Sequence, residues 1–349
     1  MNSLSRSSNV FMTLKSPWGR LVLATVISLP LLWLALENAD LLLLGTFLKT
    51  VDVAWLWGAA SLMGLMQLIS GLRICQLLTV SRSRVQPSLS RAVIVSCAHQ
   101  TAQRFLPLRL GEVLMLWMVY RLMRIRPAAN LRSWVVLRLW DFRFVAVGFA
   151  VSMSYMLFDH TSSLLPLAFC LLPAVLLIIL SPMQLLKSGL WGIRMIGKFF
   201  SVEVITKIET IILEGIADLN TRPHGLLAIA TLALASWLCS WMIFYCLLHS
   251  MSAELNLLQV LGITCGAALI SAIPLQTVAG LGINETGQTV LFILAGLEST
   301  RAASLSLAFS FLHMGLCLLV PAAIAGLVTL CIFLHGRFIT VQPGSENEH

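Results

Sequence analysis

The sequence predicts an all-α polytopic membrane protein that forms a single integral membrane domain over residues 1–349. Of its residues 58% are hydrophobic and only 11% are charged, whereas soluble domains carry roughly 25% charged residues, and the mean hydropathy is +0.90. Apolar segments of about 20 residues, long enough to cross a bilayer, recur along the chain. Two further apolar regions are interrupted by proline, glycine and charged residues. We therefore expect about six full transmembrane helices and two re-entrant helical hairpins.

Basic residues set the expected orientation. Arg6, Lys15 and Arg20 precede the first apolar segment, 20–37, so residues 1–19 are a cytoplasmic N-terminus. Residues 38–52 then form an external loop. The span 53–72 returns to a cytoplasmic loop that contains Arg73, Arg82, Arg84 and Arg91. The remaining predicted spans are 134–158, 163–182, 224–249 and 302–334, and residues 335–349 are a cytoplasmic tail.

Residues 92–120 are predicted to be the first re-entrant hairpin. Acid-free arginine clusters flank the segment on both sides, so both of its ends are expected in the cytoplasm. Two full crossings need roughly 60 Å of helix, but the segment supplies only about 43 Å. Proline lacks an N–H and disfavours helix in the residue before it, so the turn is expected near Pro107.

The segment 183–222 combines basic residues with isoleucines at helical spacing. One interpretation is an interfacial cytoplasmic helix whose apolar side lies on the lipid. The other is a helix that packs on the membrane domain as a connector.

Residues 257–297 are predicted to be the second hairpin, entering from outside. It reads P-L-Q-T-V-A-G-L-G-I-N-E from Pro274 to Glu285, and the first reads P-L-R-L-G-E from Pro107 to Glu112. Each has an apolar arm, a proline, a glycine, a glutamate and a second apolar arm. Interrupted spans in corresponding positions of two halves are typical of an inverted-repeat transporter with its site near the midplane.

A substrate site is expected where the two breaks meet. A broken helix presents unpaired N–H groups and the positive end of its dipole. Together with Arg104 and Arg109 these favour an anion such as a phosphate. Gly280 and Gly282 permit close backbone approach, and Asn284 and Glu285 follow them.

Several of these side chains allow two interpretations. Arg109 and Glu112 either form a structural ion pair on one helix face or contact substrate. Glu285 either caps the following half-helix or belongs to the site. His99 and His313 are either hydrogen-bonded interior histidines or proton carriers, a role that Glu112 and Glu285 would also suit.

Arg138 and Asp141 open the next span in "LRLWDFR". They either lock the first hairpin to that span, or Arg138 meets a lipid phosphate at the interface. Trp134 is expected to be an interface anchor.

No cofactor or metal site is predicted. The eight cysteines form no Cys-x-x-Cys pair and do not cluster with histidine at metal-ligand spacing. No G-x-x-x-x-G-K-[ST] element is present. The net charge of +8 comes largely from arginines beside apolar spans, which orient helices and meet anionic headgroups, so nucleic acid is not an expected partner.

Three elements in order resemble the lysylphosphatidylglycerol synthase/flippase transmembrane-region family: "HQTAQRFLPLRLGEVLMLWMVYR", Arg-x-x-Asp at 138–141, and "IPLQTVAGLGINETG". The resemblance implies a polytopic domain with re-entrant helices, associated with moving lipids or lipid-linked glycans across the bacterial inner membrane. Family members that make aminoacylated lipid carry a soluble transferase domain, which the sequence does not show. Many relatives have an arginine in the last span where this chain has His313. The matched residues are Arg109, Glu112, Arg138, Asp141, Gly280, Gly282 and Glu285.

The expected function is flipping of an anionic phospholipid, or of a polyprenyl-phosphate-type lipid that carries a glycan, without catalysis. Expected partners are anionic membrane lipids, enzymes of a lipid or glycan pathway and a second copy of the chain. Two alternatives stay open. One is a membrane-embedded headgroup or glycosyl transferase, although no paired acids or histidine-rich set supports it. The other is a non-transporting scaffold that acts through its cytoplasmic arginine loops.

Overall fold

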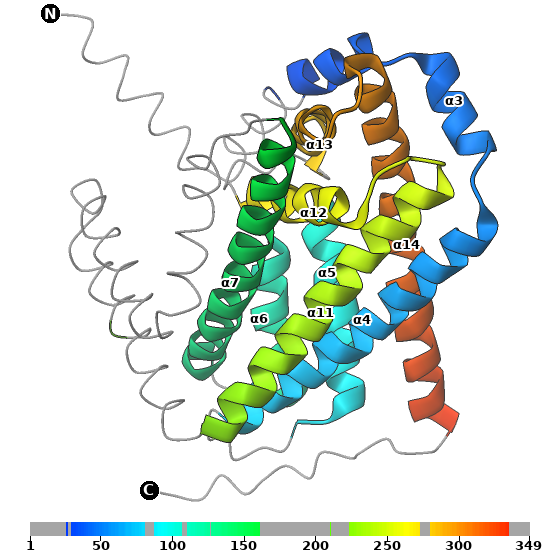
Figure 1. The fold of residues 1–349 in the computed structure, drawn as a ribbon. Helices are drawn as coiled ribbons and strands as arrows, with labels where there is room; N and C mark the ends of the chain where they lie inside the picture. The colour runs from blue at the N-terminus through cyan, green and yellow to red at the C-terminus, as the bar shows by residue number, and fades with distance from the viewer. Residues whose placement is uncertain are drawn as a thin grey trace, which may run out of the picture.

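The computed structural model describes residues 29–80, 87–106, 110–125, 127–160, 223–272 and 280–334, together with residues 26 and 210. Every regular element in these ranges is a helix, which confirms the all-α class, and Figure 1 shows the helices gathered in one bundle. The predicted N-terminus 1–19, the span 163–182 and the tail 335–349 lie outside these ranges, as does the predicted helix 183–222 apart from Thr210.

The long helices coincide with predicted spans. Three are long and apolar enough to cross a membrane, over Val53–Thr79, Leu227–Ser250 and Ser299–Phe333. A fourth candidate arises if the bent pair Leu29–Glu37 and Leu41–Lys49 is one span, so the described part of the chain has three or four candidate spans. The helices in order are α3 (Leu41–Lys49), α4 (Val53–Val80), α5 (Leu89–Phe105), α6 (Leu110–Met123), α7 (Pro127–His160), α11 (Pro223–Ser250), α12 (Leu257–Ala272), α13 (Ile283–Leu294) and α14 (Ser299–Leu334).

The external loop predicted at 38–52 is wrong over most of its length, because α3 occupies it. The helix Leu29–Glu37 turns by 86° into α3. Asp40 starts the new helix, since its carboxylate accepts hydrogen bonds from the N–H groups of Leu42 at 2.8 Å and Leu43 at 3.3 Å. The N–H of Asp40 donates to Ser304 Oγ at 2.9 Å, which attaches this corner to α14.

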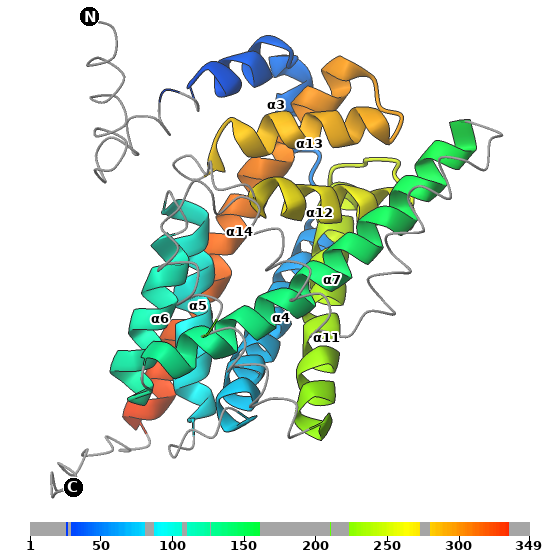
Figure 2. The same cartoon turned by 90° about the vertical axis from the view of Figure 1, so that its left-hand side faces the viewer.

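Helices α4, α5 and α6 run in alternating directions. Gln67 of α4 donates to Gln100 of α5, and near the other end of α5, Arg91 Nη1 donates to the carbonyl of Leu122 in α6 at 2.9 Å. The α5–α6 hairpin therefore enters and leaves at the same end of the bundle (Figure 2). With 17 and 14 residues its arms are shorter than a bilayer's hydrocarbon core of about 30 Å. Its depth in the membrane stays a prediction.

The second interrupted region is also two helices, α12 and α13, of 16 and 12 residues. In both Figure 1 and Figure 2, α12 and α13 run across the direction of α4, α11 and α14, near one end of the bundle. The first hairpin instead runs along that direction. The re-entrant position of this second hairpin and the inverted repeat stay predictions.

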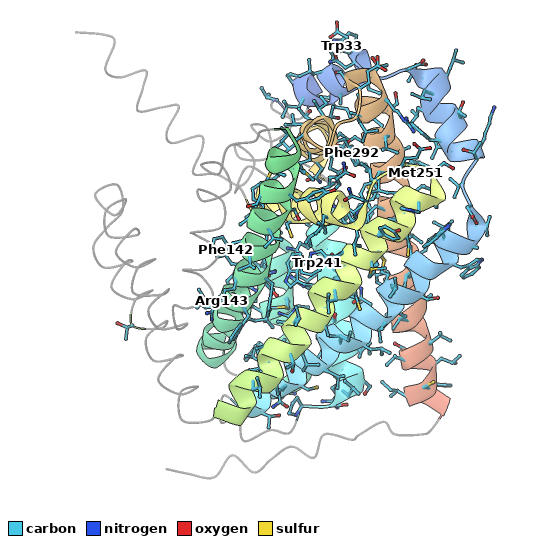
Figure 3. All side chains as sticks on the ribbon, in the orientation of Figure 1. Trp33, Phe142, Arg143, Trp241, Met251 and Phe292 are labelled. Carbon is cyan, nitrogen blue, oxygen red and sulfur yellow. The ribbon has the colours of Figure 1, made fainter. Side chains whose placement is uncertain are left out.

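The packed core lies where α4, α11, α13 and α14 meet. Met63, Leu247, Met251, Phe292 and Phe309 are fully buried there, and Figure 3 shows Met251 and Phe292 among these helices. Lipid tails are as apolar as these side chains, so close packing rather than escape from water holds such helices together. The core fixes the scaffold against which the first hairpin is placed.

Candidate functional site

The two helices of the first hairpin end and begin on either side of the turn that the sequence predicts. The residue before a proline prefers extended backbone, and Leu106, which precedes Pro107, has φ −86° and ψ 131° and ends α5. Gly111 then allows α6 to lie against α5, because a Cβ on it would stand 2.5 Å from the backbone nitrogen of Gln103. Arg109 lies outside the described residues, so its pairing with Glu112 stays a prediction.

Glu112, in the first turn of α6, is the centre of a buried hydrogen-bond network. Its side chain is 10% exposed. From α5, His99 Nε2 lies 3.0 Å from one carboxylate oxygen and Gln103 Nε2 donates to the other at 3.3 Å. From α7, Trp134 Nε1 donates at 2.8 Å and Arg138 donates a charge-assisted bond. The carboxylate therefore joins both arms of the hairpin to the next long helix.

Asp141 forms a second centre one helical turn after Arg138. Its carboxylate accepts from Arg73 Nη2 of α4 at 2.6 Å and from Trp237 Nε1 of α11 at 3.1 Å, while Arg138 Nη1 lies 3.5 Å away. Arg138 thus bridges Asp141 and Glu112. The prediction that Arg138 and Asp141 lock the first hairpin to the following helix agrees with this geometry.

Arg73 corrects a prediction. The sequence places it in a cytoplasmic loop after a span that ends at residue 72, but α4 continues to Val80. The side chain of Arg73 is only 7% exposed and pairs with Asp141. A buried guanidinium needs a carboxylate partner, and Asp141 supplies it from a helix that is distant in sequence.

A cavity of about 580 Å³ joins these groups. The charged residues on its described wall are Arg73, Arg104, Arg138, Glu112 and Asp141. Three guanidinium groups face two carboxylates there, so the wall has a surplus of one positive charge. His99, Gly280, Asn284 and His313 also line the cavity.

Arg104 carries the surplus charge. It lies near the end of α5, and its Nη2 donates to Nδ1 of His313 in α14. A guanidinium has no acceptor atom, so Nδ1 is the acceptor and the imidazole is neutral in this arrangement. Within the described residues no carboxylate pairs with Arg104. Helix α5 thus supplies the guanidinium, and α14 supplies its neutral partner.

The second hairpin contributes only part of its predicted site residues to the cavity. Gly280 and Asn284 line it. Gly282 and Glu285 instead cap α13: Gly282 has φ 86°, and its N–H donates to Glu285 Oε2 at 2.6 Å. Glu285 is 3% exposed. Its hydrogen bond to the N–H of Gly282 matches the capping interpretation.

Trp134, expected as an interface anchor, donates to Glu112 and lies under the guanidinium of Arg138, 5.4 Å from ring centroid to Cζ. In the described ranges, no group of three or more His, Cys, Asp or Glu side chains could hold a metal ion. The residues that the sequence missed, Arg73 and Trp237, come from apolar helices without a local motif.

The family model described as the lysylphosphatidylglycerol synthase TM region matches residues 21–333. The chain belongs to this family. A search of curated proteins finds no match.

The match to the lysylphosphatidylglycerol synthase TM region extends over all the described helices that form the cavity. It confirms the predicted resemblance. Together with the candidate spans it establishes a multi-pass membrane protein of a lipid-related family.

Proposed function

We propose that the protein flips an anionic phospholipid or a lipid-linked glycan of the polyprenyl-phosphate type across the bacterial inner membrane. The cavity with its surplus positive charge is the observation that carries the proposal. A charge in an apolar bundle is costly and usually marks a site for a substrate or an ion. Arg104 supplies charge-assisted hydrogen bonds for a phosphate, while the lipid tails stay outside in the bilayer.

The surrounding network supports this role. Glu112, Arg138, Asp141 and Arg73 neutralise one another and are held by donors from α5, α7 and α11. A guanidinium already bound to a carboxylate has less capacity for a phosphate. Arg104, which has a neutral partner, keeps that capacity. The proposed headgroup therefore binds in the cavity with its phosphate at Arg104, beside Gly280 and Asn284 of the second hairpin.

The test is lipid inversion in proteoliposomes that contain the full chain. Phosphatidylglycerol labelled on its acyl chain is reconstituted, and a membrane-impermeant reductant bleaches the outer leaflet. We expect wild-type protein to make the inner-leaflet lipid accessible, and Arg104→Ala to slow inversion by about tenfold or more, because a charged hydrogen bond is lost. The matched control is Arg121→Ala, since Arg121 is exposed on α6 and stacks on Trp117 outside the cavity.

Two results would contradict the proposal. Wild-type proteoliposomes that bleach no further than protein-free liposomes would remove the transport function. If Arg104→Ala and Arg109→Ala proteins both moved lipid at the wild-type rate, the assignment of the headgroup site to this hairpin would be wrong.

A further inference from the structure

The wall of the cavity formed by α4 and α11 carries several hydroxyl groups, whereas the wall formed by the first hairpin carries the charged residues Arg104 and Glu112. These two helices pack closely: a Cβ on Gly58 of α4 would lie 3.7 Å from Cys246 Sγ of α11. They present three serines to the cavity, Ser70, Ser236 and Ser240, which we call the serine wall. Ser236 and Ser240 are four residues apart and so lie on one face of α11.

The hydroxyls of the serine wall are unusual for hydroxyls in apolar helices. Such groups commonly donate to the carbonyl four residues earlier. Thr79, Ser154 and Thr264 do so here at 2.8–2.9 Å. Ser70, Ser236 and Ser240 have no hydrogen-bond partner among the described residues. Since the three residues line the cavity, their hydroxyls are available to whatever fills it.

Arg73 lies beside these hydroxyls, on the same helix as Ser70. Its charge is compensated by Asp141, at 2.6 Å, but its Nε atom is buried and has no partner in the described part of the chain. Leaving such a donor unpaired is costly. Because Asp141 compensates its charge, Arg73 adds no surplus charge beside the hydroxyls of the serine wall.

Both carboxylates on the described cavity wall are already paired with arginines, and this affects which lipid headgroup the cavity can bind. Glu112 is bound by Arg138, and Asp141 is bound by Arg73. A headgroup that carries an ammonium would find no free carboxylate on the described wall, and Arg104 would repel it. A headgroup with a phosphate and neutral hydroxyls meets a cation and free hydroxyls instead.

We propose that the serine wall binds the hydroxyl-bearing part of the headgroup, a glycerol or a sugar, while Arg104 binds its phosphate. The inference rests on the proposed function, since it assumes that the cavity receives a lipid headgroup. It narrows the substrate class to phosphodiester lipids whose headgroup carries hydroxyls, and it predicts weaker binding of headgroups that carry an ammonium.

The experiment measures lipid binding to the purified full chain by competition with fluorescent phosphatidylglycerol. The competitors have identical acyl chains: phosphatidylglycerol, phosphatidylmethanol and phosphatidylethanolamine. Phosphatidylmethanol has the same singly charged phosphodiester but no free hydroxyl. We expect phosphatidylglycerol to bind about three- to tenfold more tightly than phosphatidylmethanol, and phosphatidylethanolamine to bind most weakly.

Substitutions assign the preference to residues. Ser236→Ala combined with Ser240→Ala should reduce phosphatidylglycerol affinity to that of phosphatidylmethanol and leave phosphatidylmethanol binding unchanged, which also shows that the variant is folded. The matched control is Ser154→Ala, because Ser154 donates to its own helix at 2.8 Å and is not on the cavity wall. It should keep the wild-type preference.

The outcomes separate the two proposals. Equal wild-type binding of phosphatidylglycerol and phosphatidylmethanol, or equal loss of both in the double variant, would overturn the serine-wall assignment but not lipid transport. A wild-type protein that binds none of the lipids would contradict the proposed function as well. Glycerol 3-phosphate should compete poorly, and competition as strong as that of phosphatidylglycerol would mean that the occupant is a soluble phosphate ester.

Discussion

At the residue scale, Glu112 determines most of the geometry of the site. Its carboxylate receives hydrogen bonds from His99 and Gln103 of its own hairpin and from Trp134 and Arg138 of α7. Removing one partner of a buried charge pair leaves the other without compensation, which usually costs more than the pair contributes. Glu112 and Arg138 should therefore be energetically coupled.

A double-mutant cycle tests this coupling. We expect Glu112→Gln and Arg138→Gln each to lower the free energy of unfolding in detergent. The double variant should lose less than the sum of the two, with a coupling of about 0.5–3 kcal/mol. Thermal unfolding followed by circular dichroism gives the values. Strict additivity would show that the ion pair makes no contribution of its own.

Part of this network could be predicted from sequence. Charges in an apolar chain need partners, which identified Glu112, Arg138 and Asp141 as members of a site. Arg73 is not predicted as a site residue, because an arginine that follows an apolar segment is already accounted for by the cytoplasmic orientation of the following loop. Its partner is 68 positions away, and no local pattern carries information about a contact at that distance.

At the scale of elements, the first hairpin depends on close contact of its two arms. A Cβ at Gly111 would lie 2.5 Å from Gln103 N and 2.6 Å from Gln103 Cα, both backbone atoms that cannot move aside. Real Cβ atoms do not approach backbone so closely, so the arms would have to separate. The hydrogen bonds from α5 to Glu112 would then lengthen.

Gly111→Ala should accordingly destabilise the protein by about 1–3 kcal/mol and slow lipid inversion. Gly326→Ala is the matched control, because no atom lies within 4 Å of its added Cβ. It should be neutral or slightly stabilising, as alanine favours helix over glycine. The measurements are thermal unfolding and proteoliposome inversion, and equal melting temperatures for both variants would refute the close-contact argument.

The hydropathy of the sequence predicts some of these elements and not others. Proline and arginine patterns correctly placed the break between α5 and α6, since proline restricts the backbone locally. Hydropathy did not reveal that residues 41–49 form a helix after an 86° corner. The corner depends on the helix cap by Asp40 and on the hydrogen bond from Asp40 to Ser304 in α14. A hydropathy value averaged over a window of sequence does not detect these two contacts.

At the scale of the whole molecule, the described helices define two ends. The N–H of Asp52 donates to the carbonyl of Ser250 at 2.8 Å, so the start of α4 and the end of α11 lie together. The end of α6, which Arg124 directly follows, lies at the opposite end of the bundle, because Arg91 near the start of α5 donates to the carbonyl of Leu122. The basic flanks predict that this second end is cytoplasmic.

Cysteine labelling tests the orientation. A membrane-impermeant maleimide should label Ser252→Cys in cells whose outer membrane has been permeabilised, and Arg124→Cys only after the inner membrane is also opened. Both positions are exposed, and the wild-type chain measures the background from its native cysteines. Labelling of both variants from the same side would contradict the predicted topology.

The bridged network of Arg73, Asp141, Arg138 and Glu112 has an electrical consequence. Moving one elementary charge through a membrane potential of 100 mV involves about 2.3 kcal/mol of work. The four side chains sum to zero charge and are tied to one another, so displacing them together transfers no charge and the potential does no work on them. Among the charged residues on the described cavity wall, Arg104 is then the one that would sense the voltage, and a bound singly charged phosphodiester would cancel that response.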